Sequence, residues 1–210
     1  MAYKTNVPGW ILASASPRRK EILSNLGLRF DIDPSRIQEP VRKSGEAPSG
    51  YVVRVARLKA KDTARRHSSG LIIGADTVVV LGKRLLGKPE SREEASAMLS
   101  RLSGRWHEVW SGLCLYDSEE KRSRSIACCS RVHFRALKPS DIEWYLDAGE
   151  YRDKAGAYAV QGYASLFIDR IEGCYFNIVG FPIAAFEMLC KKSGIRLTDY
   201  LNIKPLQVKR

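Results

Sequence analysis

The sequence predicts an α/β or α+β protein built around a mixed β-sheet. Two observations support this prediction. Segments with the pattern of buried strands intermingle with segments of helical periodicity along the whole chain. In the second half, two long strand-like segments follow one another and are expected to pair as an antiparallel hairpin. The 210 residues, 44% of them hydrophobic, are enough for one large domain or two small lobes.

In the first half of the chain, an apolar strand leads directly into a helix. Ser16 can cap that helix, and Pro17 suits its first position because its missing N–H would have had no partner there. A polar stretch at residues 35–49 contains Pro and Gly and predicts a mobile loop. The expected elements of this half are strands at residues 9–14, 29–34, 71–81 and 85–88, and helices at residues 17–26 and 51–66.

In the second half, two helices are opened by Ser-x-x-Glu capping boxes, Ser91 with Glu94 and Ser140 with Glu143. Gly194 closes the last helix. The sequence contains neither a P-loop nor a Gly-x-Gly-x-x-Gly motif, so those two phosphate-binding folds are not predicted. The expected elements of this half are helices at residues 91–102, 140–148 and 181–192, and strands at residues 107–116, 124–136 and 165–171.

Composition narrows the class of protein. No apolar run approaches the roughly 20 residues of a membrane span, and the first ten residues lack the apolar stretch of a secretory signal. The five cysteines show no Cys-x-x-Cys spacing, which favours free thiols in a reducing compartment over disulfides or zinc. We therefore expect a soluble cytoplasmic protein that does not bind a membrane.

The net charge of +12 predicts an attraction to polyanions. A nucleic acid is one possible partner, but the basic residues are spread along the chain and no zinc finger, basic zipper or aromatic RNA platform is present. A free nucleotide would respond to the same field. Nucleic acid is therefore the less favoured partner.

The turn after the first strand combines hydroxyls with positive charge. Ser14 and Ser16 precede Arg18 and Arg19, and the free N–H groups of a helix start lie beside them. This arrangement suits a phosphorylated ligand. An ordinary helix cap with solvated arginines is the alternative.

Charged or polar residues interrupt apolar patterns at three further places. Lys59 falls within the apolar stripe of its helix, where it needs an anion unless it reaches solvent along the helix edge. Asp76 interrupts a core strand, where burial predicts a nearby cation and suggests a catalytic base or metal ligand rather than a structural turn acid. Gln161 follows a charged pair among very small residues, and its amide suits the edge of a base. The alternative there is a tight loop held by an ion pair.

The positions of Lys88 and His107 in the sequence bear on whether they belong to the same site. Lys88 follows the strand of Asp76 by one tight turn and can swing towards the same place. His107 could act as a base, but a structural histidine is the favoured interpretation. Gly74 and Ala75 leave room for something to approach the backbone beside Asp76.

Seven short motifs occur in order along residues 10–189. They are Ala13-Ser14-Ala15-Ser16-Pro17-Arg18-Arg19, Lys59-Ala60, Gly74-Ala75-Asp76-Thr77, Lys88-Pro89, Leu102-Ser103-Gly104-Arg105 with His107, Asp153-Lys154-Ala155-Gly156-Ala157-Tyr158 with Gln161-Gly162, and Val179-Gly180-Phe181-Pro182. Each motif alone is weak, but seven in register are highly specific. Together they resemble the Maf (septum-formation inhibitor) family of nucleotide pyrophosphatases.

The resemblance implies hydrolysis of a nucleoside triphosphate to the monophosphate and pyrophosphate, assisted by Mg²⁺ or Mn²⁺. It also implies an α/β fold like that of the inosine triphosphate pyrophosphatases, in which an elongated mixed sheet with flanking helices forms two lobes around a central cleft. A homodimer is suggested by the same likeness. The implied domains are an N-terminal extension at residues 1–9, a catalytic domain at 10–195 and a basic tail at 196–210.

The resemblance also assigns roles to individual residues. Asp76 is the expected proton acceptor and, with Glu39, the expected metal ligand. The expected substrate-binding residues are Ser14, Arg18, Arg19, Lys59, Thr77, Lys88 and Gln161, of which Arg19, Thr77 and Gln161 are tied to substrate choice.

Glutamine at position 161 goes with dTTP and UTP in the family, whereas glutamate goes with 7-methylated guanosine triphosphate. A 7-methyl-GTP pyrophosphatase remains the alternative within the family. A non-catalytic nucleic-acid-binding or division-regulating protein is the alternative of another class.

Overall fold

The computed structural model describes residues 9–202. Of the predicted N-terminal extension only Gly9 lies within this range, and residues 203–210 of the predicted tail lie outside it. The described chain is a mixed α/β fold with one seven-stranded sheet, as the sequence predicted. The helices are α1 (Pro17–Asn25), α2 (Pro48–Ala64), α3 (Arg92–Leu102), α4 (Pro139–Asp147), α5 (Tyr175–Val179) and α6 (Ile183–Lys192).

The sheet combines parallel and antiparallel pairing. Strand order is β2-β1-β3-β5-β6-β7, and β4 also pairs with β3. Strand β1 is parallel to both of its neighbours, whereas all pairs from β3 onwards are antiparallel. The strands are β1 (Trp10–Leu12), β2 (Asp31–Ile32), β3 (Leu71–Leu81), β4 (Arg84–Leu86), β5 (Trp106–Asp117), β6 (Arg122–Phe134) and β7 (Ile168–Glu172).

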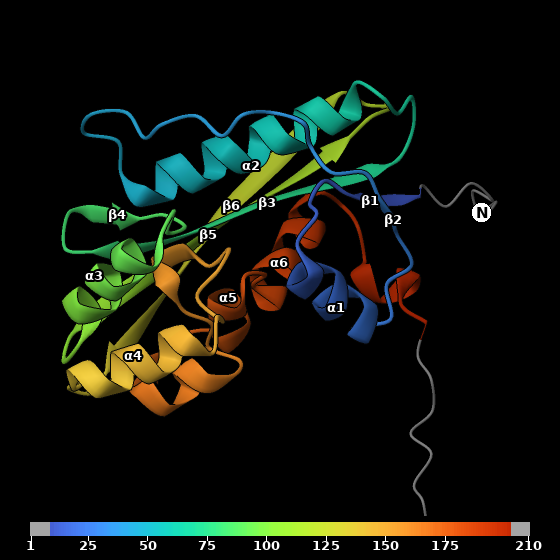
Figure 1. Ribbon diagram of the computed structural model, residues 1–210. Helices are drawn as coiled ribbons and strands as arrows, with labels where there is room; N and C mark the ends of the chain where they lie inside the picture. Colours follow the sequence, from blue (N-terminus) through green and yellow to red (C-terminus); the bar gives the residue numbers. More distant parts are fainter. Residues whose placement is uncertain (1–8, 203–210) are drawn as a thin grey trace, which may run out of the picture.

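Helix α2 lies along one face of the sheet, across β3, β5 and β6, and the other helices lie on the opposite side (Figure 1). Two glycines allow α2 to approach closely. A Cβ built on Gly74 would lie 2.1 Å from the Ala56 carbonyl oxygen, and one built on Gly112 would lie 2.3 Å from the Val52 carbonyl oxygen. The room beside Gly74 that the sequence indicated is therefore filled by the backbone of α2.

The larger core lies on the opposite face, between the sheet and α3, α4 and α6. Its members include Phe134, Tyr145, Phe167 and Phe186, all with relative exposures of 0–1%. The predicted capping box of α3 is present at its start, because the Ser91 hydroxyl accepts a hydrogen bond from the Glu94 amide at 3.1 Å. These apolar contacts hold the helices against the sheet.

Several predicted boundaries were wrong. Helix α4 begins at Pro139 rather than Ser140, and its capping carboxylate is Asp141, which accepts from the Lys138 amide at 2.9 Å. The predicted strand at 165–171 is a 3₁₀ helix over Tyr163–Phe167 followed by β7. Helix α5 was not predicted, since five residues are too few to show helical periodicity.

The chain beyond α6 packs back onto the first strand. A 3₁₀ helix at Leu197–Tyr200 buries Leu197, and the Tyr200 ring meets the Trp10 ring edge-on at 5.3 Å. Leu201 forms an isolated bridge with Leu28. The described part of the predicted basic tail is therefore in contact with the sheet.

All five cysteines are free thiols. Within residues 9–202, no helix is long and apolar enough to cross a bilayer.

Candidate active site

A stretch of strand β3 lacks a partner along one edge. Along one edge of β3, strand β5 pairs with residues 71–80. Along the other edge of β3, β1 pairs only with residues 71–73 and β4 only with residues 79–81. Residues 74–78 are left between them, and Figure 1 shows β1 and β4 at opposite ends of β3. Asp76 and Thr77 lie in this open stretch, and successive strand residues face opposite sides of the sheet.

Asp76 is buried beside a lysine, as its position in a core strand predicted. Its side chain is 6% exposed, and its Oδ1 accepts a hydrogen bond from Lys59 Nζ at 2.8 Å. Lys59 Nζ also donates to Oε1 of the half-exposed Glu39 at 2.6 Å. One ammonium group therefore holds two carboxylates together.

The second oxygen of Asp76, Oδ2, is buried and has no hydrogen-bond partner within the described chain. Burial raises the pKa of Asp76 above the ordinary value, and the charges of Lys59 and Arg19 oppose that rise only in part. A buried carboxylate oxygen without a donor is costly to a folded protein. Such an atom is suited to accept a proton or to bind a cation.

The pKa of Glu39 moves in the opposite direction. Burial by itself would raise it, but the hydrogen bond and charge of Lys59, helped by the charges of Lys88 and Arg19, bring it below the ordinary value. Glu39 therefore keeps its negative charge at neutral pH. It belongs to the loop at residues 33–47, which has neither helix nor strand.

Ion pairs tie that loop to α2 and to the turn that follows this helix. The Glu46 carboxylate accepts two hydrogen bonds from the Arg54 guanidinium, both 2.7 Å, which lower the pKa of Glu46 to about 2. At the other end, Asp33 is paired with Arg66 at 2.8 Å. These two contacts connect both ends of the loop that carries Glu39 to the α2 segment.

The guanidinium of Arg19 makes its hydrogen bonds to other parts of the protein. Its guanidinium donates to the Gly180 and Ala75 carbonyls, each at 3.0 Å. It also donates to the Ser14 hydroxyl at 3.0 Å and to the Thr77 hydroxyl at 3.2 Å. Burial lowers the pKa of Arg19, whose side chain ties the end of β1 to β3 and to the turn after α5.

Ser14 and Thr77 are members of the same network. Besides Arg19, Ser14 Oγ accepts from the Ser16 amide at 3.3 Å. Thr77 Oγ1 contacts Ser111 Oγ at 2.9 Å. Ser16 occupies the N-cap position of α1 as predicted, but its hydroxyl makes no capping hydrogen bond.

Three further cations lie near one another. Arg18 is half-buried and donates from Nε to the Val179 carbonyl at 3.2 Å. Burial lowers the pKa of Lys154, and the positive charges of Arg18 and Lys88 lower it further. The charges of Asp153 and Glu150 oppose this lowering, so Lys154 has both carboxylates and cations nearby. We call Arg18, Lys59, Lys88 and Lys154 the cation cluster.

Lys154 was not among the predicted site residues. The alternative interpretation of its segment was a tight loop held by an ion pair of Asp153 with Lys154, whereas Lys154 Nζ donates to the Arg152 carbonyl at 3.0 Å. Its position in a motif of very small residues was the available signal. Gln161 is exposed, and its amide makes no hydrogen bond within residues 9–202, so the structure does not join it to Arg19 or Thr77.

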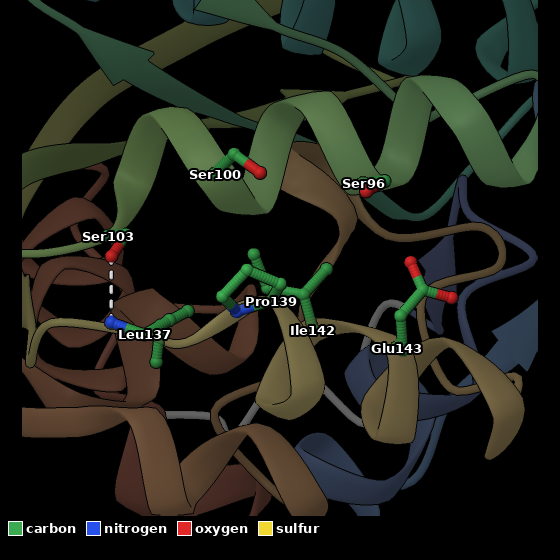
Figure 2. Close-up of a pocket in the computed structure, with 7 residues that line it drawn as sticks. All are labelled: Ser96, Ser100, Ser103, Leu137, Pro139, Ile142 and Glu143. Carbon is green, nitrogen blue, oxygen red and sulfur yellow. Dashed lines mark hydrogen bonds between the residues drawn. The ribbon is translucent and has the colours of Figure 1, made fainter.

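A hollow of about 180 Å³ lies between α3 and α4 and shares no residue with the cation cluster (Figure 2). Ser96 and Ser100 of α3 line one wall together with Ser103, the residue that follows the helix, and Ser103 accepts a hydrogen bond from the Leu137 amide at 2.7 Å. Glu143 on the opposite wall is the one charged lining residue, so the hollow does not suit a triphosphate.

Comparisons with known proteins place the chain among described families and relatives. Residues 9–193 match the family described as "Maf-like protein". The chain is 47% identical over 188 residues to the dTTP/UTP pyrophosphatase of Desulforamulus reducens, which covers 89% of this chain and 97% of the relative. It is 48% identical over 182 residues to the dTTP/UTP pyrophosphatase of Clostridioides difficile, which covers 87% and 93%.

Among solved structures, the dITP/XTP pyrophosphatase of Mycobacterium abscessus is similar with a TM-score of 0.43 and 12% identity, covering 89% of this chain and 97% of that one.

Proposed function

The chain belongs to the family of Maf-like proteins, and from this premise we propose that it hydrolyses dTTP and UTP to the nucleoside monophosphate and pyrophosphate. The observation that supports the reaction most directly is the buried Oδ2 of Asp76, which has no hydrogen-bond partner within residues 9–202 and belongs to a carboxylate paired with Lys59 of the cation cluster. A carboxylate to move a proton and cations to hold phosphates are the two requirements of phosphoanhydride hydrolysis.

The cation cluster binds the triphosphate. A nucleoside triphosphate carries about four negative charges at neutral pH, so several cations are needed to neutralise it. Arg18, Lys88 and Lys154 come from three separate elements and act on one another through their charges. Their repulsion falls when the triphosphate binds, and they stabilise the charge that builds on the leaving pyrophosphate.

Asp76 acts as the general base. Lys59 holds Oδ1 at 2.8 Å, which fixes the carboxyl group and leaves Oδ2 to accept the proton of the attacking water. The raised pKa makes Asp76 a better base than an ordinary aspartate. The charge and the hydrogen bond of Lys59 oppose that rise.

The carboxylates of Asp76 and Glu39 fit a bound Mg²⁺ or Mn²⁺. Residues 9–202 contain no cluster of three or more His, Cys, Asp and Glu, but Mg²⁺ is commonly held by one or two carboxylates together with substrate phosphates. When bound, such a cation would polarise the phosphate oxygens and lower the pKa of water.

Substrate choice depends on Gln161 and on the network around Arg19. An exposed amide with a free donor and a free acceptor suits the edge of a thymine or uracil ring. Arg19 and Thr77 act by holding the end of β1 against β3, because their polar atoms are occupied by protein partners. A base that fails to pair with Gln161 leaves polar groups unsatisfied, which disfavours it.

The test is a pyrophosphate-release assay across dTTP, UTP, CTP, GTP and 7-methyl-GTP, each with Mg²⁺, with Mn²⁺ and with a chelator. We expect dTTP and UTP to be preferred and the chelator to abolish activity. Asp76→Asn should abolish release while circular dichroism stays unchanged. A preference for 7-methyl-GTP, or substantial activity in the Asp76→Asn variant, would overturn the assignment.

A further inference from the structure

The segment that carries Lys154 has a strained backbone. Asp153, Gly156 and Ala157 have positive φ angles of 59°, 70° and 63°. Residues other than glycine rarely adopt this conformation because their Cβ meets the backbone. Two of the three are not glycine, so surrounding contacts must hold the segment in place.

The segment is held from two sides. The Gly156 amide donates to the Gly87 carbonyl at 2.9 Å, and Gly87 immediately precedes Lys88. On the other side, the hydroxyl of Tyr158 lies 2.8 Å from Nε2 of His107 on strand β5. One short segment therefore connects two lysines of the cation cluster to the sheet.

The contact between His107 and Tyr158 is fully enclosed. The two residues are 2% and 5% exposed, and their rings meet edge-on at 5.4 Å. Phe134 packs edge-on against both rings, at 5.1 Å from His107 and 4.9 Å from Tyr158. No solvent competes for the hydrogen bond, so its loss leaves a buried polar atom unpaired.

The tautomer of His107 follows from its neighbours. Burial lowers the pKa of His107 to about 4 and raises that of Tyr158, so at neutral pH the imidazole is uncharged and the phenol keeps its proton. The Arg105 carbonyl lies close enough to favour a proton on the ring, although Nδ1 falls short of a well-formed hydrogen bond. The Tyr158 hydroxyl then donates to Nε2.

We propose that His107 is a positioning residue of the nucleotide site: by accepting the hydrogen bond of Tyr158 it holds residues 153–158 in their strained conformation and keeps Lys154 and Lys88 directed at the triphosphate. This inference rests on the proposed pyrophosphatase function. His107 touches no substrate, since it is buried beneath the segment that it holds.

The test compares two tyrosine variants that each lose a buried hydroxyl. Tyr158→Phe keeps the ring packing and removes the hydrogen bond to His107. Tyr145→Phe is the matched control, because Tyr145 is equally buried and its hydroxyl, which lies near Glu150 and the Ala159 backbone, makes no well-formed hydrogen bond within residues 9–202. We expect Tyr158→Phe to raise KM for dTTP roughly tenfold with a smaller effect on kcat, and Tyr145→Phe to change neither.

His107 itself is tested by a conservative and an apolar variant. His107→Gln keeps a group able to accept the hydrogen bond, so its KM for dTTP should stay close to that of the wild type. His107→Leu lacks such a group and should show the raised KM of Tyr158→Phe. The double variant His107→Leu/Tyr158→Phe should be no worse than either single one. A KM in Tyr158→Phe equal to that of Tyr145→Phe overturns the proposal.

Amide hydrogen exchange of residues 153–158 separates this inference from the proposed function. Faster exchange in Tyr158→Phe and His107→Leu, but not in Tyr145→Phe, supports the positioning role. Unchanged exchange overturns it. If the wild-type protein releases no pyrophosphate from any nucleotide, the proposed function fails, and the exchange result still decides whether His107 holds the segment.

Discussion

Replacing Gly74 of strand β3 by alanine adds a methyl group that clashes with the backbone of helix α2. The new Cβ would lie 2.1 Å from the Ala56 carbonyl oxygen and 2.9 Å from the Ala60 Cβ. A carbon and a carbonyl oxygen in ordinary contact are about 3.4 Å apart. Because Ala56 and Ala60 are fully buried, the helix has to retreat from the sheet by about 1 Å to relieve the clash.

The cost of Gly74→Ala can be estimated from this geometry. Overpacking a core typically costs about 1–3 kcal/mol, and a clash with backbone rather than a flexible side chain lies at the upper end, about 3 kcal/mol. For a domain of this length each kcal/mol lowers the melting temperature by about 2–4 °C, so a fall of roughly 6–12 °C is expected.

The same displacement should impair catalysis. Lys59 adjoins Ala60 in α2, so a retreat of the helix lengthens the 2.8 Å contact between Lys59 Nζ and Asp76 Oδ1. A misplacement of about 1 Å can cost roughly 10²-fold in rate. The loss of kcat/KM should therefore be larger than the loss of folded protein at the assay temperature explains.

Thermal unfolding and pyrophosphate release measured on the same preparations test this reasoning. Gly50→Ala is the control, since Gly50 lies in the same helix, its nearest atom to a new Cβ is 3.8 Å away, and alanine favours a helix. A Gly74→Ala protein with the melting temperature and kcat/KM of the wild type would show that close approach of α2 does not position Lys59.

Three further predictions follow from charges in and around the site. Because the pKa of Asp76 is raised, kcat/KM plotted against pH should fall on the acid side at a higher pH than an ordinary aspartate would give. Lys59→Met removes a charge that lowers this pKa, so the acid-side fall should move to still higher pH. An acid-side fall at the same pH in both proteins contradicts this. His107 has a pKa of about 4 in the folded protein against about 6.5 unfolded, so the free energy of unfolding should rise with pH between about 4 and 6.5, by roughly 3 kcal/mol, and stay level above. Urea titrations across this window should show a flatter profile for His107→Gln, and an equal slope would refute the assignment. Glu46→Gln weakens the clamp on the loop at residues 33–47, so limited proteolysis of that loop should be faster and kcat/KM lower, whereas unchanged cleavage would show that other contacts hold the loop.

The pairing of Lys59 with Asp76 was within reach of sequence analysis. Each residue is a charge in an apolar pattern, and helical and strand periodicity place both on the faces that meet. Helix α2 faces the even-numbered residues of β3, so its inward lysine reaches the inward aspartate. Two local irregularities on elements that pack together thus explain each other.

The partners of Arg19 could not be predicted in this way. Its Nε donates to the carbonyl of Gly180, a residue 161 positions away in the sequence. A backbone carbonyl has no signature in an amino-acid sequence, and helix α5, which presents it, was too short to be predicted. The sequence therefore revealed the charge of Arg19, but not that carbonyl and hydroxyl oxygens of the protein accept the hydrogen bonds of its guanidinium.

The open edge of β3 explains why a buried carboxylate can face a charged substrate at all. A core strand with partners along both edges would leave Asp76 enclosed, and the cost of its charge would exceed any benefit. Here β1 and β4 each cover three residues at opposite ends of the eleven-residue β3, and the stretch between them is reached by Lys59 from α2 and by Arg19 from α1. The lengths of partner strands depend on turns far from Asp76 in the chain, so no local pattern around this residue predicts the opening. The cations beside Asp76 come from outside β3: Lys59 reaches the carboxylate from α2 on the face of the sheet, and Arg19 reaches the Ala75 carbonyl from α1.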